Sequence, residues 1–473
     1  MLSRAFVTLI VNGLFWLSNG EFSNVPDLED HMIQDLDGHP CVRLLNLSGP
    51  IGCATDKVVR GDVARVHSLS QSWEADRVAL LSPDLLAGFL TKVLDEGLVV
   101  AGVIVEPTSS VPFSFSPADP FPQSQFAPYS DTEYRWNTNG SGFNMQNFDF
   151  PIVILDEDSA KLAAQNAHRN EEDDWAFPRY AVELDYRMNA EGDSAKCLSE
   201  ATCLPLGGHS VWSAMPRLPE EATSSLPTVL VVARLDTASL FHERALGADA
   251  PMSGLLLLLA AADALHLSFA QAGLERSDLA AGDDSVKGLS KKDISAIIEL
   301  GQVGLGHIDP DSTPTLYVHT QKGQTTTDEL VDQLQVGASV VDVAISAASS
   351  ETPGIPPSSL MALLDDADVD ASTCAVITEF DLAYTNPNYH SWLDGPEMLN
   401  TTAIAAAATA VARMLFTRVT TETAPEVAQT EVEELVQQLR TCFLTKDPGM
   451  TCDLVKSLMT PRTAEADHYI GVI

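Results

Sequence analysis

The chain has 473 residues, enough for two or three domains with large buried cores. It carries 66 acidic and 27 basic residues, a formal net charge of -39, which repels phosphate backbones and anionic lipid. This balance argues against nucleic acid as a partner.

The first 20 residues have the features of a secretory signal peptide. One positive charge precedes a mostly apolar run over residues 5–17, and the small residues Ser18 and Gly20 suit the -3 and -1 positions of a cleavage site. We expect cleavage after Gly20, followed by an acidic linker over residues 21–40. A core strand at the N-terminus is the alternative. A signal peptide would place the mature chain in the lumen of the secretory pathway or outside the cell.

Cysteine usage also fits an oxidising compartment, since the seven cysteines form three close pairs and one leftover. We expect the close pairs as disulfides: Cys41 with Cys53, Cys197 with Cys203, and Cys442 with Cys452. Six cysteines allow 15 connectivities, so proximity alone favours this scheme. Their spacing lacks the C-x-x-C knuckles of structural zinc sites. Cys374, in the apolar run STCAVIT, is expected to be a buried free thiol.

Three sequons lie along the chain, at Asn46, Asn139 and Asn400. Each has Ser or Thr two residues later, and none is followed by proline. We expect all three to be glycosylated in a lumenal chain.

Short strand-like runs alternate with loops in the first part of the chain; they are CVRLL, DVARVH, RVALL, LVVAGVIVE and FPIVIL. The longest loop, Pro107 to Phe148, exceeds the ordinary limit of about 15 residues. We expect it to be a binding excursion or a surface ornament.

Residues 226–267 have the strand, loop and helix pattern of a doubly wound α/β domain. Val229 to Val232 is a short apolar run without alternation, which suits a strand covered on both faces. Gly254 to Ala270 is an apolar run of helical length. Ligands in such domains bind beyond the carboxyl ends of the strands, so we expect functional residues in the loop between them.

The second half continues this alternation. LYVHT, ASVVDVAI and CAVITEFDLAY are strand-like, and the prolines of residues 356–364 predict a helix entry. Ala403 to Phe416 is rich in alanine and predicts a helix. Its length and the charge of Arg413 argue against a membrane span.

Several separated blocks resemble the nicastrin family, in the order expected for it; they are PCVRLLNLSGPIGCATD, FDFPIVILDED, CLPLGGHSVWSAM, VVARLDTASLF, ELGQVGL, PPSSL and NYHSWLD. Nicastrin is the glycosylated ectodomain subunit of γ-secretase. The resemblance implies an α/β protein with a small lobe over residues 41–222 and a large lobe over residues 223–473. The large lobe would be built like a di-zinc aminopeptidase, with a mostly parallel sheet flanked by helices.

The metal positions of such an aminopeptidase are degenerate in this sequence. A His-x-Asp is expected after the first motif strand, where the chain has Arg234-Leu-Asp236, and a GADD-type loop is replaced by GADA, with Asp249 followed by Ala250. A guanidinium repels Zn²⁺, and alanine supplies no donor. We therefore expect no catalytic residue, no metal and no cofactor. Asp236 and Asp249 are interpreted as loop-organising residues, either paired with Arg234 or exposed to solvent.

Two segments that the family contains are missing from this chain. The family has an apolar strand, a Gly-Glu turn and a DYIGS-like helix start near residues 275–292, but this chain has GLERSDLAAGDDSVKGLSKKD, without an apolar run. The chain also ends before the family's membrane anchor. Either an exon is absent from this sequence, or this form fills the gap differently.

The resemblance implies a non-catalytic γ-secretase subunit that supports assembly and substrate selection or gating, including the processing of Notch-type receptors. Its partners would be a presenilin-type protease subunit, the other γ-secretase subunits and transmembrane protein substrates. The full-length form would be membrane-associated through the complex. Two alternatives remain open: a secreted pseudo-peptidase binding lobe that acts outside the complex, and an active aminopeptidase with altered ligands.

Overall fold

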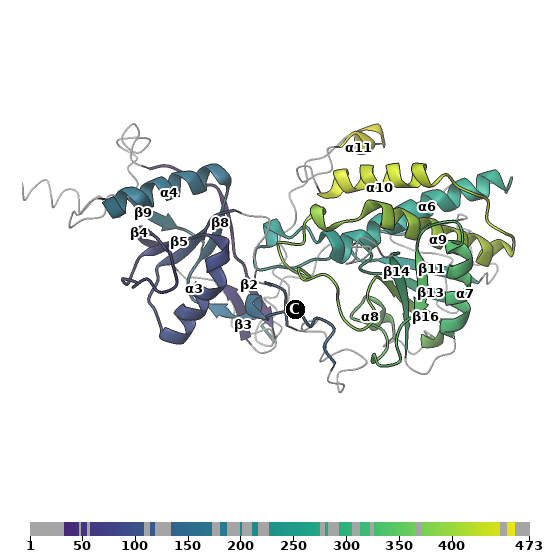
Figure 1. The fold of residues 1–473 in the computed structure, drawn as a ribbon, viewed down its shortest axis with the longest axis horizontal. Coiled ribbons are helices and arrows are strands. Elements are labelled where there is room, and N and C mark those ends of the chain that lie inside the picture. The colour runs from purple at the N-terminus through teal and green to yellow at the C-terminus, as the bar shows by residue number, and fades with distance from the viewer. Residues whose placement is uncertain are drawn as a thin grey trace, which may run out of the picture.

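The computed structural model shows two lobes, the small N-terminal lobe on the left and the large lobe on the right of Figure 1. The structure describes residues 33–46, 49–53, 57–107, 114–118, 134–172, 180–186, 199–200, 211–215, 227–274, 280–281, 293–304, 313–321, 326–364, 370–444 and 452–458. The expected signal peptide, the pair Cys197 and Cys203, and most of residues 275–292 lie outside these ranges.

The small lobe is built on a six-stranded sheet in the order β1-β8-β6-β5-β4-β9. Its strands are β1 (Gly38–Pro40), β4 (Val59–Arg65), β5 (Val78–Leu81), β6 (Gly102–Val105), β8 (Ile152–Leu155) and β9 (Ala181–Leu184). The four central strands run parallel, and β1 and β9 close the edges antiparallel. β5, β6 and β8 are buried at every position, as parallel strands covered on both faces must be. The expected linker over residues 21–40 therefore ends in a strand of this sheet.

Two helices of the small lobe, α3 (Pro83–Glu96) and α4 (Glu157–Glu172), pack on its six-stranded sheet. α3 begins with proline in its first turn and ends at Gly97, which takes the left-handed conformation with φ 65°. Successive residues of β5 pack into different clusters, Ala79 with α3 and Leu80 with α4. Because side chains alternate along a strand, the two helices cover opposite faces.

A second, three-stranded sheet lies beside these elements, in the order β2-β3-β7. Its strands are β2 (Arg43–Asn46), β3 (Gly49–Cys53) and β7 (Asn147–Phe148), the last following a single helical turn, η3 (Phe143–Met145). A disulfide joins Cys41 to Cys53, so the segment just before β2 is fixed to the end of β3.

The large lobe contains a five-stranded sheet in the order β11-β13-β16-β14-β15. Its strands are β11 (Thr228–Ala233), β13 (Ile294–Leu300), β14 (Thr315–Thr320), β15 (Ala344–Ala347) and β16 (Cys374–Thr378). β11, β13 and β16 run parallel, β14 is antiparallel to β16, and β15 is parallel to β14. The expectation of an α/β protein with a mostly parallel sheet in its large lobe is confirmed.

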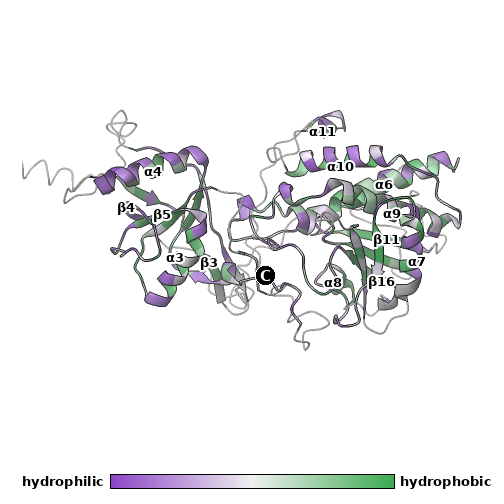
Figure 2. Ribbon diagram, viewed as in Figure 1, coloured by the Kyte–Doolittle hydropathy of each residue, from purple (hydrophilic) through white to green (hydrophobic). Residues whose placement is uncertain are grey.

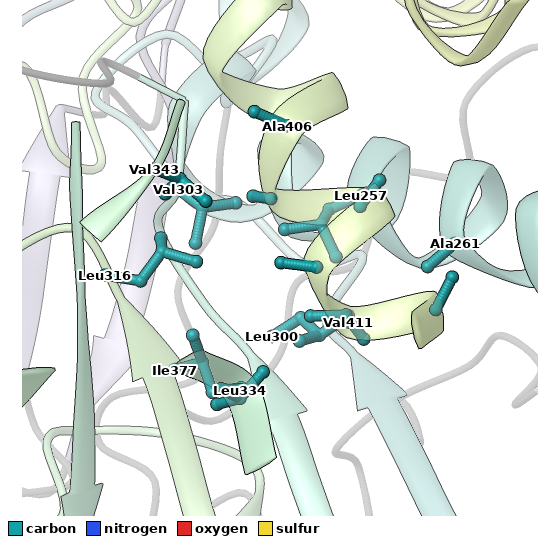
Figure 3. Close-up of a cluster of buried hydrophobic side chains, with 14 of the residues drawn as sticks. Leu257, Ala261, Leu300, Val303, Leu316, Leu334, Val343, Ile377, Ala406 and Val411 are labelled. Atoms are coloured by element: carbon teal, nitrogen blue, oxygen red, sulfur yellow. The ribbon is translucent and has the colours of Figure 1, made fainter. Parts of the chain in front are cut away.

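Three long helices cover one face of this sheet: α6 (Gly254–Gln271), α7 (Thr326–Ala338) and α9 (Thr401–Thr420). A fourth, α10 (Gln429–Leu444), packs on α9 and α6. Figure 3 shows the core between them, where Leu257, Val411 and Leu300 converge from α6, α9 and β13. The short helix α8 (Leu360–Leu364) packs on the opposite face. A second disulfide, between Cys442 and Cys452, ties the end of α10 to α11 (Asp453–Leu458).

Two helices are long and apolar enough to cross a membrane, Ala248–Gln271 and Thr401–Thr420. Both pack in the core of the large lobe, and the second is buried over 78% of its most apolar window. Figure 2 shows apolar residues on these helices and on the sheet, while α4 and α10 carry many polar residues. Their hydropathy is therefore explained by core packing.

Two glycines permit close contacts that a side chain would block. A Cβ on Gly254, at the start of α6, would lie 2.2 Å from the carbonyl oxygen of Leu300 in β13. A Cβ on Gly337, in α7, would lie 2.3 Å from the carbonyl oxygen of Ala410 in α9. These positions set how closely α6 approaches the sheet and α7 approaches α9.

The prediction that Val229 to Val232 is covered on both faces is confirmed, since Val229 and Val231 pack against the core of the long helices, and Leu230 and Val232 pack against the cluster that contains α8. All six residues of β11 are partly exposed, whereas the last five residues of β13 and all of β16 are buried. Among the described residues, β11 pairs with β13 alone and so forms an edge of the sheet. Near the proposed gap, Ala280–Ala281 forms the two-residue strand β12, paired with β10 (Ser213–Ala214).

Direct contacts join the two lobes. The backbone N–H of Val42 donates to the carbonyl of Leu240, 3.0 Å away. His39 of β1 lies 2.7 Å from a carboxylate oxygen of Glu243, in the single turn η4 (His242–Arg244) of the large lobe. Three further short helical segments belong to the large lobe: η5 (Ala248–Ser253), η7 (Ala371–Thr373) and η8 (Pro396–Met398).

Candidate functional site

The loops after β11, β13 and β16 meet at the carboxyl edge of the large sheet and enclose a small cavity. Its volume is about 30 Å³, room for one or two water-sized groups. Polar side chains that line it include Arg234, Asp236, Glu299, Gln302, Ser358 and His390. This is the position at which α/β proteins bind ligands. Three of the four residues singled out as degenerate metal positions line it: Arg234, Asp236 and Ala250.

Arg234 and Asp236 form an ion pair at the end of β11. Nε of Arg234 donates to Oδ1 of Asp236 at 3.1 Å, and Nη2 donates to Oδ2 at 2.8 Å. Partial burial opposes the charge on Asp236, but the hydrogen bonds and positive charge of Arg234 outweigh it and hold the pKa of Asp236 below its usual value. The carboxylate is therefore ionised and already engaged by a cation.

Glu299 is a buried acid that the sequence patterns did not identify as a site residue. It lies in β13 with 1% of its surface exposed, and its two carboxylate oxygens accept the backbone N–H groups of Ser359 and Leu360 at 3.1 and 3.0 Å. Burial raises its pKa, although nearby Arg234 and these two hydrogen bonds partly offset the effect. In the sequence, the only indication that Glu299 belongs to the site was its place in the ELGQVGL block of the family resemblance.

Asp249 and Asp394 organise the loop that leads into α6. The carboxylate of Asp394 accepts the backbone N–H groups of Asp249 and Ala250 at 3.0 and 3.1 Å, and Asp249 accepts the N–H of Gly304 at 2.9 Å. Both acids are fully buried. Burial raises the pKa of Asp249, and burial together with the charge of Asp249 raises the pKa of Asp394. The alternatives considered for Asp249, pairing with Arg234 or solvent exposure, are both incorrect, because the residue is buried and its Oδ1 accepts the backbone N–H of Gly304.

His390 completes the cavity wall. It has a positive φ of 52° and stacks on the ring of Tyr389, with the ring centroids 4.0 Å apart. Burial and the nearby Arg234 cation lower the pKa of His390 to about 3, so its imidazole is neutral at physiological pH.

The residues at the degenerate positions do not fit Zn²⁺. Arg234 places a cation where a neutral imidazole would be needed, and it occupies the oxygens of Asp236. Ala250 has no donor atom, and Asp249 is bonded to a backbone amide. Within the described ranges, no group of three or more His, Cys, Asp or Glu side chains is arranged to hold a metal ion.

The described parts of the long insertion, Pro107 to Phe148, lie against the large lobe beside this cavity. Trp136 is 3% exposed and packs edge-on against His319 and Phe380, with ring centroids 5.5 and 6.0 Å away. It shares a buried cluster with Ala250 and Tyr389, two residues of the cavity wall.

Hydrogen bonds fix the insertion in this place. The hydroxyl of Tyr134 donates to the carbonyl of Leu382, and the hydroxyl of Ser116 donates to the carbonyl of Tyr389 at 2.6 Å. The described parts of the insertion are thus not a surface ornament, because they connect the lobes. The alternative of a binding excursion stays a prediction.

The remaining predicted residues lie away from the cavity. Cys374 is a buried free cysteine in β16. Asn139 is exposed, and Asn46 ends β2. Asn400 caps α9, where its side-chain oxygen accepts the N–H of Ala403 at 3.1 Å.

Comparisons with known proteins agree with this architecture. The family model for the nicastrin small lobe matches residues 40–190, and the model for the nicastrin large lobe matches residues 227–277 and 272–416. Nicastrin from Arabidopsis thaliana is 33% identical over 494 residues, an alignment that covers 95% of this chain and 72% of that protein. Human nicastrin is 28% identical, with 76% of this chain and 59% of that protein covered.

The crystal structure of the γ-secretase component nicastrin has the same fold, with a TM-score of 0.72 over 86% of this chain and 78% of that chain at 21% identity. A zinc aminopeptidase from Bacillus subtilis gives a TM-score of only 0.32 at 12% identity, which is too low to support any conclusion. On the family models and the Arabidopsis relative, the chain belongs to the nicastrin family.

Proposed function

We propose that this protein is a non-catalytic subunit of γ-secretase, whose lobes support assembly with a presenilin-type protease subunit and limit which transmembrane substrates approach it. Family membership supports the complex, since a relative of known structure is described as a γ-secretase component. Secretory delivery is supported by the two disulfides and by the exposed sequon residue Asn139.

The observation that carries the non-catalytic role is the ion pair between Arg234 and Asp236. A zinc peptidase needs a metal-bound water that ionises near neutral pH. Here the guanidinium excludes the metal, and the neighbouring Ala250 cannot replace a ligand. The domain therefore keeps the loops of an enzyme-like site without the groups for hydrolysis, which is consistent with binding.

The test is a lobe exchange in plant cells that lack nicastrin. Residues 40–416 of this chain replace the matching region of Arabidopsis nicastrin, while the relative keeps its own flanking segments. We expect the chimera to co-precipitate the presenilin-type subunit and to restore γ-secretase cleavage of a membrane-bound reporter. The matched control carries Trp136→Ala, which removes a buried contact between the lobes.

Two results would contradict the proposal. One is a glycosylated chimera that reaches the cell surface but neither binds the presenilin-type subunit nor restores cleavage. The other is chelator-sensitive release of amino acids from aminoacyl peptides by the purified chain, which would favour the active aminopeptidase.

A further inference from the structure

His319, in β14, lies where the described parts of the insertion meet the large lobe. The residue is 0% exposed. The ring of Trp136 packs against its imidazole with the centroids 5.5 Å apart, and the ring of Phe380 packs against it at 5.6 Å. Trp136 lies in the region matched by the small-lobe model, whereas His319 and Phe380 lie in the region matched by the large-lobe model. A side chain of the other lobe therefore covers this imidazole.

The hydrogen bonds of His319 suit a neutral ring. Its Nε2 lies 2.9 Å from the carbonyl oxygen of Phe380 and 3.0 Å from the hydroxyl of Thr378. Because a carbonyl oxygen only accepts, Nε2 carries the proton of the neutral ring. Nδ1 is buried and has no hydrogen-bond partner among the described residues. A second proton would have to go to this nitrogen.

The surroundings of His319 do not favour an imidazolium. Within the described part of the chain, Asp381 is the one carboxylate that promotes its charged form, and Oδ1 of Asp381 already accepts the N–H of Ser349 at 2.6 Å. Burial lowers the pKa of His319 to about 4, and the carbonyls of Phe380 and Gly354 together with Asp381 offset this effect only in part. The ring is therefore neutral while Trp136 covers it.

We propose that His319 makes the contact between the insertion and the large lobe sensitive to acid, because protonation of its imidazole releases Trp136 and opens the contact. Once the contact is open, water reaches the ring, and the ring binds a proton at the ordinary histidine pKa of about 6.5. Below that pH the proton stabilises the open state relative to the closed state. The inference concerns the two lobes of the chain and does not depend on the proposed function.

The two pKa values set the size of the effect. With a pKa of about 4 in the closed state and about 6.5 in the open state, acidification from about pH 7.5 to about pH 5 should raise the open fraction by up to about thirtyfold. Asp249 and Asp394 have raised pKa values and act in the opposite direction. Their effect is the same in a variant that changes His319 alone, so a comparison with that variant isolates the histidine.

The experiment measures hydrogen–deuterium exchange of peptides that contain Tyr384, in the full chain purified from a secreting host. The N–H of Tyr384 reports on the contact because it donates to the carbonyl of Trp136 at 2.8 Å. Exchange is compared at about pH 7.5 and about pH 5, after correction for the intrinsic effect of pH on amide exchange.

The variant is His319→Gln, whose side-chain amide can donate to the carbonyl of Phe380 but takes up no proton. His319→Asn, which also lacks a titrating group, replaces it if the first variant is not secreted. The control is His168→Gln, at an exposed histidine of α4. Acid should reduce the protection of Tyr384 by up to about thirtyfold more in the wild type and the control than in the His319 variant. Each protein is compared with itself at the two pH values, so a less stable variant still gives the ratio.

Three outcomes overturn the proposal. An equal loss of protection in the wild type and the His319 variant would show that this histidine does not control the contact. A matching loss over β5 in the small-lobe core would show general unfolding by acid. Greater protection of the wild type at the lower pH would show that the charged ring is held on the faces of Trp136 and Phe380 as a cation–π contact.

Discussion

Arg234 donates hydrogen bonds to both carboxylate oxygens of Asp236, at 3.1 and 2.8 Å, where β11 ends at the edge of the large-lobe cavity. Asp236 is therefore already paired with a cation, at one of the positions that the family resemblance marked as a degenerate metal position. Since the arginine stays protonated at all physiological pH values, this contact does not open by titration.

The first prediction is that the purified chain holds no stoichiometric zinc, and that Arg234→His alone does not create a zinc site. The variant supplies one imidazole, but Ala250 still lacks a donor and Asp249 still bonds to the amide of Gly304. Metal analysis by mass spectrometry after dialysis checks both proteins. One or two zinc ions per wild-type chain would contradict the prediction.

Hydrophobic patterns were sufficient to predict most elements of the fold. The apolar runs in β5, β6 and β8 predicted strands, and the runs that became α6 and α9 predicted helices. These hydrophobic patterns are local, because a strand covered on both faces or a buried helix has a run of consecutive apolar residues.

The site was only partly predictable, because its contacts join distant parts of the chain. Asp249 was singled out from the GADA loop, but its loop is held by Asp394, 145 residues away. Glu299 acts through backbone amides 60 and 61 residues away. For β11 the apolar run correctly predicted cover on both faces. It could not predict that β11 pairs with a single strand among the described residues, because that depends on the other strands present.

The second prediction concerns the crossing of α7 and α9. Gly337→Ala should lower the free energy of unfolding by about 1 to 3 kcal/mol, because the added methyl group would overlap the backbone of Ala410. The better helix propensity of alanine, about 1 kcal/mol, offsets part of this loss. Urea unfolding measures it, with the exposed neighbour Val336→Ala as control. An unchanged or higher stability of the Gly337 variant would show that the helices can separate freely.

The third prediction concerns the contact between the insertion and the large lobe. Trp136→Ala removes a buried ring that packs on His319 and Phe380. The substitution should lower the free energy of unfolding of this part of the protein by about 3 to 5 kcal/mol. We expect faster hydrogen exchange over residues 380–392. Trp73→Ala is the control, since Trp73 packs on Phe89 inside the small lobe. Equal exchange over residues 380–392 in both variants would mean that Trp136 does not hold the insertion.

The fourth prediction is the covalent map. Non-reducing peptide mapping should link Cys41 to Cys53 and Cys442 to Cys452, as in the structure, and Cys197 to Cys203 in the part of the chain outside it. Cys374 should be recovered unlinked, because it is buried in β16. Any peptide that joins Cys374 to another cysteine would contradict this scheme.

The fifth prediction follows from the buried acids Asp249 and Asp394. Burial, and for Asp394 also the charge of Asp249, raises their pKa values, so the folded state binds protons more tightly than the unfolded state. Their contribution to stability is full below the ordinary carboxyl pKa of about 4 and is lost as pH rises through the raised values. The folded state should therefore lose stability between about pH 5 and about pH 7.5.

Asp249→Asn isolates this effect. The asparagine oxygen can still accept the N–H of Gly304, but the charge that raises the pKa of Asp394 is gone. Urea unfolding at the two pH values should show a smaller loss of stability in this variant than in the wild type. Glu422→Gln removes an exposed charge and should leave the wild-type loss unchanged, which separates the buried pair from the general effect of the acidic surface. If Asp249→Asn and the wild type lost the same stability over this range, the two acids would not be coupled, and the pH dependence would have to come from the surface charge alone.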